Sequence, residues 1–331
     1  MSIYLFVILV INLIIFMSYN KLSKIYNLYD IPDQQRKKHK KPTPLLGGFV
    51  ILINLFFYCL LEYFEIFKFI FFSSNKDILF FLFCSLCFFT VGFVDDKQNL
   101  KPNLKLFLYI LIILFLMVLD DDLIIKNINF TFTGFIFHLH YFSYFFTILC
   151  FLLFINSFNM LDGINGQAGS YTIFISLLMI YLNININFFI GLIIIMSVFL
   201  YFNFKEKMFL GDSGSILLSF IISYFFIKSY NKGIDIYSDE IFLIMMIPGF
   251  ELLRLALQRL YKKKHPFSPD NEHIHHLLLN KTSFMNSYIL IQILLIFPFC
   301  FYLLISNSYI SLIISIIIYT YLIFKFSENN N

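Results

Sequence analysis

The sequence predicts an all-α polytopic membrane protein, and three observations lead to this fold class. Of the 331 residues, 60% are hydrophobic and only 13% are charged, whereas a soluble domain has about 25% charged residues. The mean hydropathy is +0.81. The apolar residues form long runs separated by short polar segments. Since no domain boundary, repeat or long linker appears, residues 1–331 are expected to form a single membrane-embedded domain.

About eleven apolar runs could form transmembrane helices, although some are short for a bilayer that needs about 20 residues per helix. The first run, 3–17, has no positive charge before it and is followed by Lys21 and Lys24. A signal peptide has the opposite polarity, so this run is predicted to be a span with its amino end outside. The other runs are 45–61, 78–94, 104–119, 143–157, 169–184, 188–203, 214–229, 239–257, 286–305 and 309–324.

The distribution of basic residues predicts the orientation, because cytoplasmic loops carry an excess of Lys and Arg. Eleven spans, with the amino end outside and the carboxyl end cytoplasmic, leave only five of the 24 basic residues outside. These five are Lys68, Lys76, Lys126, Lys228 and Lys232. An even number of spans would break this bias. The cytoplasmic loops are then 20–44, 95–105, 156–168, 203–213 and 254–285.

One outer loop, 120–141, is longer than the others. Its segment 124–137 alternates weakly between apolar and polar residues and is compatible with a small hairpin on the outer face. The densest acidic run, which begins at Asp120, and the pair His138 and His140 also lie in this loop. They are predicted to be on the wrong side of the membrane to join a cytoplasmic site.

The polar run 156–166 lies between two apolar segments and is the strongest indication of a site. It contains Asn156, Asn159, Asp162 and Asn165 together with two glycines, which allow a ligand to approach the backbone closely. Its single carboxylate lies where a membrane protein normally has Lys or Arg. The run therefore predicts the floor of a polar site at the membrane surface.

Adjacent carboxylates are costly at a membrane face unless they are paired or bound to a cation. Asp95 and Asp96 form such a pair at the start of the second cytoplasmic loop. They could mark a solvated helix end, or they could bind Mg²⁺, which takes one or two carboxylates together with substrate phosphate oxygens. In the fourth loop Asp212 opens a helix among small residues, as an ordinary N-cap or as part of the same site.

Two further loops carry basic or imidazole groups. The first loop ends with a basic cluster that includes Lys41, and then has Thr43; this pattern suits anionic lipid or a phosphate-bearing ligand. In the fifth loop His273, His275 and His276 lie within four residues. Their spacing matches no common zinc motif, so hydrogen bonds from imidazoles to a diphosphate are the preferred interpretation, with zinc as the alternative.

Together these segments resemble the polyprenyl-phosphate N-acetylhexosamine-1-phosphate transferases (glycosyltransferase family 4). The similar segments occur in the family's order and spacing and are 30–48, 92–105, 156–169, 209–215 and 273–276. The His-Ile-His-His form is more similar to the bacterial branch that primes O-antigen, common antigen or teichoic acid than to the peptidoglycan branch.

The resemblance implies a definite reaction at the cytoplasmic face of the bacterial inner membrane. Undecaprenyl phosphate would attack the sugar-bearing phosphorus of a UDP-N-acetylhexosamine and release UMP, with Mg²⁺ or Mn²⁺ as the cofactor. UDP-GlcNAc is the first choice of donor, and FucNAc, QuiNAc or MurNAc-pentapeptide donors stay open. No nucleic acid partner is expected, and a homodimer is compatible with the resemblance.

The resemblance also assigns roles to residues. Asp95, Asp96 and Asp162 would be catalytic, and Asp212 and Asp96 would bind the metal. Residues that would contact substrates are Lys41, Thr43, Lys105, Asn156, Asn159, Asn203, Phe209, His273, His275 and His276. The chain departs from the family pattern at Asn165 and Glu251, where Asp is common, and at Gln167, where Leu is frequent.

A polytopic transporter or flippase is the rival hypothesis from another class. It predicts ionisable residues near the middle of the membrane and internal repeats with broken helices. The sequence instead places its carboxylates at one face and shows no repeat, which favours the enzyme.

Overall fold

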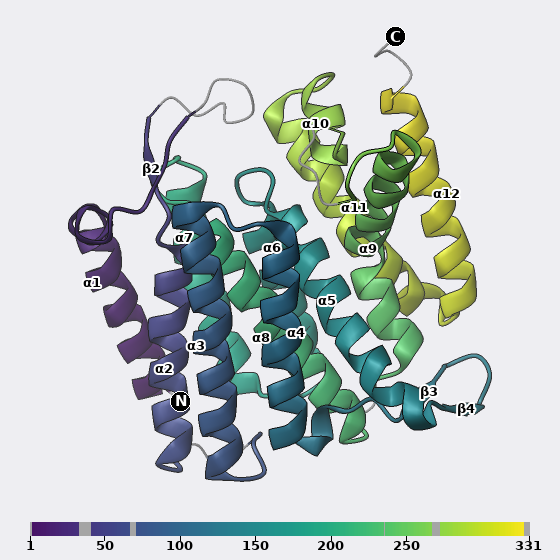
Figure 1. The fold of residues 1–331 in the computed structure, drawn as a ribbon, viewed down its shortest axis with the longest axis horizontal. Helices are drawn as coiled ribbons and strands as arrows, with labels where there is room; N and C mark the ends of the chain where they lie inside the picture. Colours follow the sequence, from purple (N-terminus) through teal and green to yellow (C-terminus); the bar gives the residue numbers. More distant parts are fainter. Residues whose placement is uncertain (1, 33–40, 67–70, 235, 267–271, 328–331) are drawn as a thin grey trace.

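The structure is a computed structural model that describes residues 2–32, 41–66, 71–234, 236–266 and 272–327. In these ranges the chain forms a bundle of long helices (Figure 1), which confirms the predicted all-helical fold class. Every predicted apolar run corresponds to one long helix, and a short additional helix, α10 (Ile274–Leu279), precedes the last two. The long helices are α1 (Ser2–Tyr26), α2 (Gly47–Tyr63), α3 (Asn75–Gln98), α4 (Pro102–Leu119), α5 (Ser143–Leu161), α6 (Gln167–Tyr181), α7 (Ile186–Asn203), α8 (Gly211–Asn231), α9 (Ser238–Tyr261), α11 (Phe284–Ile305) and α12 (Ser308–Ser327).

Eight of the described helices are long and apolar enough to cross a membrane, namely α1, α3, α4, α5, α7, α8, α11 and α12. Helices α2 and α6 are apolar but shorter. Helix α9 contains Pro248 and has charged residues near both ends. The beginning of α1 and the end of α12 lie at opposite ends of the bundle in Figure 1, as an odd number of crossings requires. Eleven crossings and their orientation stay predictions.

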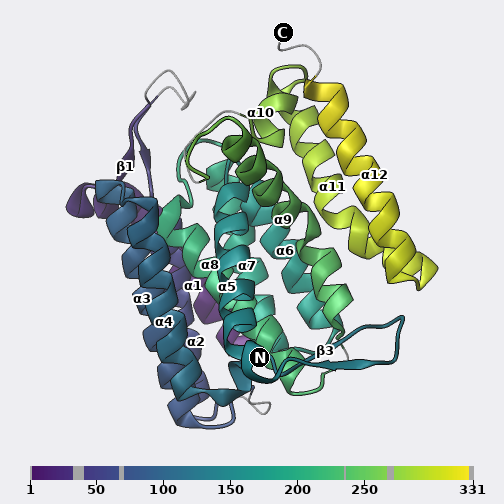
Figure 2. The same ribbon diagram turned by 45° about the vertical axis from the view of Figure 1, so that its right-hand side comes forward.

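Helix α8 is the centre of the bundle. Its residues from Ser213 to Ser229 are buried, and α2, α3 and α5 pack around it. Close packing with α3 depends on Gly92, because a Cβ atom there would lie 2.5 Å from the Cα atom of Ser213. Small residues let helix backbones approach in this way. The contact places the last turns of α3 beside the first turn of α8 (Figure 2).

The predicted cytoplasmic loops are shorter than expected, because the helices extend into them. Asn156 and Asn159 lie on the last turns of α5 rather than in a loop, and Asp95 and Asp96 lie on the last turns of α3. A polar side chain can stay in a helix when the helix backbone satisfies it. The Asn156 amide does this by donating to the carbonyl oxygen of Leu152 at 2.7 Å.

Two small antiparallel pairs of strands lie at opposite ends of the bundle. Strands β1 (Tyr29–Asp30) and β2 (Thr43–Pro44) were not predicted. The chain after β2 pairs with the α7–α8 loop through a bridge between Leu45 and Phe209. At the other end, β3 (Asn127–Asn129) pairs with β4 (Ile136–His138), which confirms the predicted hairpin.

A buried ion pair joins helices at the end of the bundle that holds the hairpin. The side chain of Lys228 is fully buried on α8. Its Nζ atom lies 2.5 Å from Oδ2 of Asp120 and 3.5 Å from Oδ2 of Asp77. The hydroxyl group of Tyr224 is 3.2 Å away. Asp120, which the sequence placed outside the site, thus neutralises a buried lysine at the other end of the bundle.

We expect Lys228→Ala to lower the free energy of unfolding by about 3–5 kcal/mol, because the buried Asp120 carboxylate would lose its partner. Thermal unfolding in detergent micelles would measure the loss. The double variant Lys228→Met/Asp120→Asn should lose less than Lys228→Ala, because no uncompensated charge stays buried. An unchanged midpoint for Lys228→Ala would contradict this account.

Candidate active site

The end of α3, the end of α5 and the start of α8 lie at the end of the bundle that carries α10 and β2 (Figure 1). Asp95 and Asp96 come from α3, Asp162 follows α5, and Asp212 is in the first turn of α8. Asp212 is close enough to Asp96 and Asp95 for their negative charges to act on its carboxyl group. Asp162 is close enough to Asp212 and Asp96 to be affected by their charges. The structure thus brings together the four carboxylates that the sequence singled out.

Asp96 caps the amino end of α8. Its Oδ1 atom accepts a hydrogen bond from the backbone N–H of Asp212 at 2.7 Å, and its Oδ2 atom accepts one from Ser213 at 3.0 Å. The first N–H groups of a helix have no partner within the helix, and the positive end of the helix dipole favours an anion there. Asp96 therefore sets the position of Asp212 as well as lying in the cluster itself.

Asp95 is paired with Lys105, which was predicted to contact a substrate phosphate. The Lys105 Nζ atom lies 2.5 Å from Oδ2 of Asp95, and Oδ1 of Asp95 accepts a hydrogen bond from the backbone N–H of Leu100 at 2.7 Å. Asp95 is buried, whereas Lys105 is partly exposed. A phosphate that approached the cluster would meet this ammonium group.

Asp162 lies in the short turn between α5 and α6. Removal from water raises its pKa well above the usual range of a carboxyl group, and the nearby negative charges of Asp212 and Asp96 add to this effect. Bringing several carboxylates together costs free energy in a site of reduced dielectric constant. The cluster therefore favours a bound cation or protons that offset its charge.

The asparagines predicted to bind substrate form hydrogen bonds that join the segments around the site. The Asn203 side chain accepts a hydrogen bond from the backbone N–H of Gly166 at 2.6 Å and donates one to the carbonyl oxygen of Met208 at 2.9 Å. Oδ1 of Asn159 accepts a hydrogen bond from the Ser215 hydroxyl group at 2.5 Å. Together with Asn156, these residues have backbone or side-chain partners within the protein, and their substrate contacts stay predictions.

The segment around β2 lies beside the same site. Thr43 is buried, and its hydroxyl group is within hydrogen-bonding distance of the carbonyl oxygens of Lys41 and Glu206, at 3.1 and 3.3 Å. Phe209 forms a backbone hydrogen bond with Pro44 at 2.9 Å. The hydroxyl group of Thr43 thus helps to join two loops. The side chain of Lys41 is exposed. The rest of the basic cluster, 36–40, lies outside the described residues.

The three predicted histidines gather at α10. The ring centroids of His275 and His276 are 4.3 Å apart, and those of His273 and His275 are 5.2 Å apart. His275 is buried against Gly163, where an added Cβ atom would overlap its ring. Burial, and then the nearby His276 and His273, lower the pKa of His275 well below its usual range. A neutral imidazole can donate one hydrogen bond and accept another.

Glu251 holds α10 in place, a role that the sequence did not reveal. Its Oε1 atom accepts hydrogen bonds from the backbone N–H of Ile274 and from Arg254, both at 2.7 Å. Its Oε2 atom accepts one from the Tyr319 hydroxyl group of α12 at 2.6 Å. Arg254 also donates to the carbonyl oxygen of Glu272 at 2.7 Å. Glu251 and Arg254 form an i,i+3 ion pair on α9, and this pair belongs to a junction of α9, α10 and α12.

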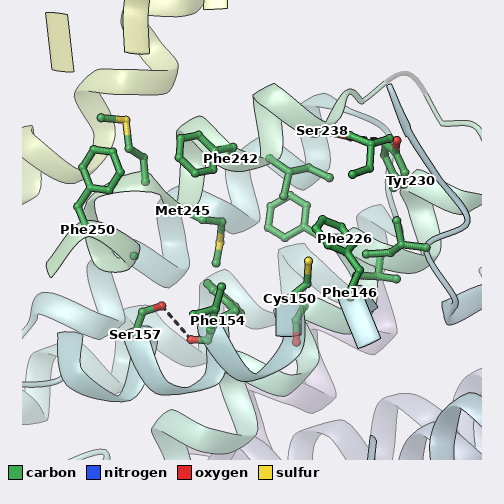
Figure 3. A pocket seen from close by; sticks show the side chains of 18 of the residues that line it. Phe146, Cys150, Phe154, Ser157, Phe226, Tyr230, Ser238, Phe242, Met245 and Phe250 are labelled. Carbon is green, nitrogen blue, oxygen red and sulfur yellow. Dashed lines mark hydrogen bonds between the residues drawn. The ribbon is translucent and has the colours of Figure 1, made fainter. Parts of the chain in front are cut away.

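An apolar cavity of about 280 Å³ lies between α5, α8 and α9. Figure 3 shows Phe154 of α5 on one side, and Phe242 and Met245 of α9 on the other. Ser157 lines this cavity and also a smaller one of about 20 Å³, which His273 and His275 line as well. The two cavities share Ser157 as a lining residue, and the smaller one lies at the histidine end of the site.

The acidic cluster fits a divalent cation such as Mg²⁺, because its donors are carboxylate oxygens. Asp212 and Asp96 are the residues predicted to bind it. In the part of the chain that the structure describes, no three His, Cys, Asp or Glu side chains are arranged to hold an ion by themselves. Mg²⁺ usually takes one or two protein carboxylates, with substrate phosphates and water as its other ligands, so the ion stays a prediction.

The protein is thus a bundle with helices long and apolar enough to cross a membrane and with several carboxylates at one end. Residues 78–230 match the model of glycosyl transferase family 4. The chain is similar to this family of transferases over slightly less than half of its length.

Known transferases have related sequences over about three quarters of the chain. The chain is 27% identical over 273 residues to the undecaprenyl-phosphate alpha-N-acetylglucosaminyl 1-phosphate transferase of Escherichia coli (strain K12). The matched region covers 78% of this chain and 71% of that protein. The protein of the same name from Thermotoga maritima is 28% identical over 253 residues, covering 76% and 73%. That of Yersinia pestis is 26% identical over 264 residues, covering 76% and 69%.

Proposed function

We propose that the protein transfers an N-acetylhexosamine-1-phosphate, with GlcNAc-1-phosphate as the first choice, from a UDP-sugar to undecaprenyl phosphate. A phosphate oxygen of the lipid forms a bond to the sugar-bearing phosphorus, and the bond from that phosphorus to the oxygen of UMP breaks. The products are undecaprenyl-diphosphate-sugar and UMP. This reaction would be the first membrane step of a cell-surface polysaccharide of the O-antigen, common antigen or teichoic acid type.

The observation that carries the proposal is the meeting of Asp95, Asp96, Asp162 and Asp212 next to Lys105. A phosphate monoester has a second pKa of about 6, so the lipid phosphate is largely dianionic at neutral pH and is already nucleophilic. The main difficulty is charge repulsion, since two like charges ~4 Å apart cost about 4 kcal/mol at an effective dielectric constant of 20. A site for phosphoryl transfer must therefore offset charge and align the reacting groups.

The chain supplies groups for both tasks. Asp212 and Asp96 would hold Mg²⁺ or Mn²⁺, which as a Lewis acid would stabilise charge on the transferring phosphorus. Lys105 would exchange its contact with Asp95 for one with a phosphate oxygen. The imidazoles of His273, His275 and His276 would donate hydrogen bonds to the diphosphate.

The apolar cavity supports a lipid substrate. It is bordered by apolar side chains of α5, α8 and α9 and reaches Ser157, beside the histidine end of the site. A long polyprenyl tail could lie against α5 and α9 while its phosphate reached the carboxylates. The tail would then stay in an apolar environment during the reaction, which avoids the cost of exposing it to water.

The test is UMP release by the purified protein with undecaprenyl phosphate, Mg²⁺ and a panel of UDP-sugars. UDP-GlcNAc is expected to give the fastest release, and omission of Mg²⁺ or of the lipid should abolish it. Release only with UDP-MurNAc-pentapeptide, or with FucNAc or QuiNAc donors, would change the donor and leave the reaction class intact. Failure with every donor would overturn the proposal.

We expect Gly163→Ala to reduce UMP release by about 10²-fold, because displacement of a site group by about 1 Å has this effect. The added methyl group would overlap the buried ring of His275 and push α10 away from the carboxylates. Gly134→Ala is the control, since nothing lies within 4 Å of a Cβ atom at Gly134, although its φ of +62° makes some backbone strain inevitable. Full activity of Gly163→Ala would show that the position of His275 does not matter.

A further inference from the structure

The β3–β4 hairpin carries an apolar tip at the end of the bundle opposite the active site. The exposed fractions of Phe132, Phe135, Ile136 and Phe137 are 55%, 81%, 55% and 62%. The segment 127–137 contains no Asp, Glu, Lys or Arg. A contiguous exposed apolar patch of this kind marks a surface that another apolar phase or molecule covers.

The hairpin is held in one orientation by polar contacts at its base. A two-stranded hairpin is marginally stable by itself in water, and these strands are only three residues long. The backbone N–H of Asn129 donates to the Tyr230 hydroxyl group of α8 at 2.8 Å. The backbone N–H of Thr131 donates to Asp239 of α9 at 3.0 Å, and the Thr131 hydroxyl group is 3.0 Å from that of Ser308 of α12. Three helices thus fix the direction of the tip.

The apolar tip is continuous with the outer surface of α12, one of the helices long and apolar enough to cross a membrane. The ring centroid of Phe132 lies 6.4 Å from that of Tyr309 in the first turn of α12. From Tyr309 the exposed apolar surface continues along α12 through Ile310, Ile313 and Ile317. Figure 2 shows the hairpin reaching sideways from the bundle near the lower end of α12. The tip therefore lies at the level where this span begins.

We propose that the hairpin is a membrane anchor whose tip lies in the interfacial region of the leaflet farther from the active site. Its partner is the lipid surface, because the patch is uncharged and extends the lipid-facing side of α12. Aromatic residues gather at both membrane–water interfaces, where Trp and Tyr are usual. This chain has no Trp, and in our proposal Phe132, Phe135 and Phe137 are the interfacial aromatic residues. The backbone N–H groups of Asn129 and Thr131 at the base stay bonded to the protein, so they do not become unpaired when the hairpin enters the interface.

The absence of native tryptophan allows a direct test. Phe135→Trp places a single fluorophore at the tip in the full-length protein, which is reconstituted into phosphatidylethanolamine and phosphatidylglycerol vesicles. We expect emission at shorter wavelength than that of a tryptophan in water, strong quenching by lipid brominated near the headgroup, and weak quenching by aqueous acrylamide. Phe137→Trp should give the same result from the other strand, which covers the case in which one variant fails to fold.

Asp121→Trp is the matched control, because Asp121 is exposed at the same end of the bundle but outside the hairpin. Its emission should be quenched by acrylamide and little by brominated lipid. Equal behaviour of Phe135→Trp and Asp121→Trp would overturn the proposal. Protection of Phe135→Trp from both quenchers would also overturn it and would indicate a protein surface, such as a second copy of the chain. None of these measurements depends on the proposed transferase activity.

Discussion

Asp212→Asn is expected to reduce UMP release by about 10³-fold, the upper range for the loss of one group that stabilises transition-state charge. The substitution removes the charge predicted to hold Mg²⁺ and keeps the size of the side chain. It also keeps the backbone N–H that donates to Asp96 at 2.7 Å, so the start of α8 should not move. The measurement is kcat for UMP release over a range of Mg²⁺ concentrations.

Asp121→Asn is the control for Asp212→Asn, since it removes one exposed carboxylate at the opposite end of the bundle. It should leave kcat unchanged. If Asp212→Asn kept a substantial part of its activity with an unchanged Mg²⁺ requirement, Asp212 would not be a metal ligand. The assignment of the ion would then rest on Asp96 alone.

Glu251→Ala is expected to reduce kcat/KM by about 10²-fold, although Glu251 belongs to a junction of helices rather than to the carboxylate cluster. The reason is positional, because a shift of about 1 Å in a site group can cost this much. The variant would remove the acceptor for Ile274 in the first turn of α10. It would also leave Arg254 without its carboxylate partner. Hydrogen exchange of residues 274–279 should become faster in the same variant.

The same helix offers a matched control for this second prediction. Glu240, near the other end of α9, accepts a hydrogen bond from the Tyr302 hydroxyl group of α11 at 2.8 Å, as Glu251 does from Tyr319 of α12. Glu240→Ala should therefore cost stability and leave hydrogen exchange of α10 unchanged. Tyr319→Phe should have an effect between those of the wild type and Glu251→Ala. If Glu240→Ala and Glu251→Ala lowered activity equally, the effect would be general destabilisation.

Much of the candidate site could be predicted from the sequence because its signals are local. Asp95, Asp96, Asp162 and Asp212 stand out as carboxylates at the ends of apolar runs, and the direction of each run assigns them to one side. The hairpin was predictable for the same reason, since alternation within 124–137 is visible in a short window. Loop lengths were overestimated because the side chain of Asn156 bonds to its own helix, which a count of polar residues does not show.

The sequence by itself determined that this protein is a helical membrane protein with its acidic groups at one end, since hydropathy and charge are properties of neighbouring residues. Only the tertiary structure decided which of these groups bond to one another. Asp96 accepts a hydrogen bond from Asp212, which lies 116 residues later, and Glu251 joins α10 to Tyr319, which lies 68 residues further along the chain. Such contacts depend on how α3, α8, α9 and α12 pack, and packing is set by the fit of many side chains from distant segments at once.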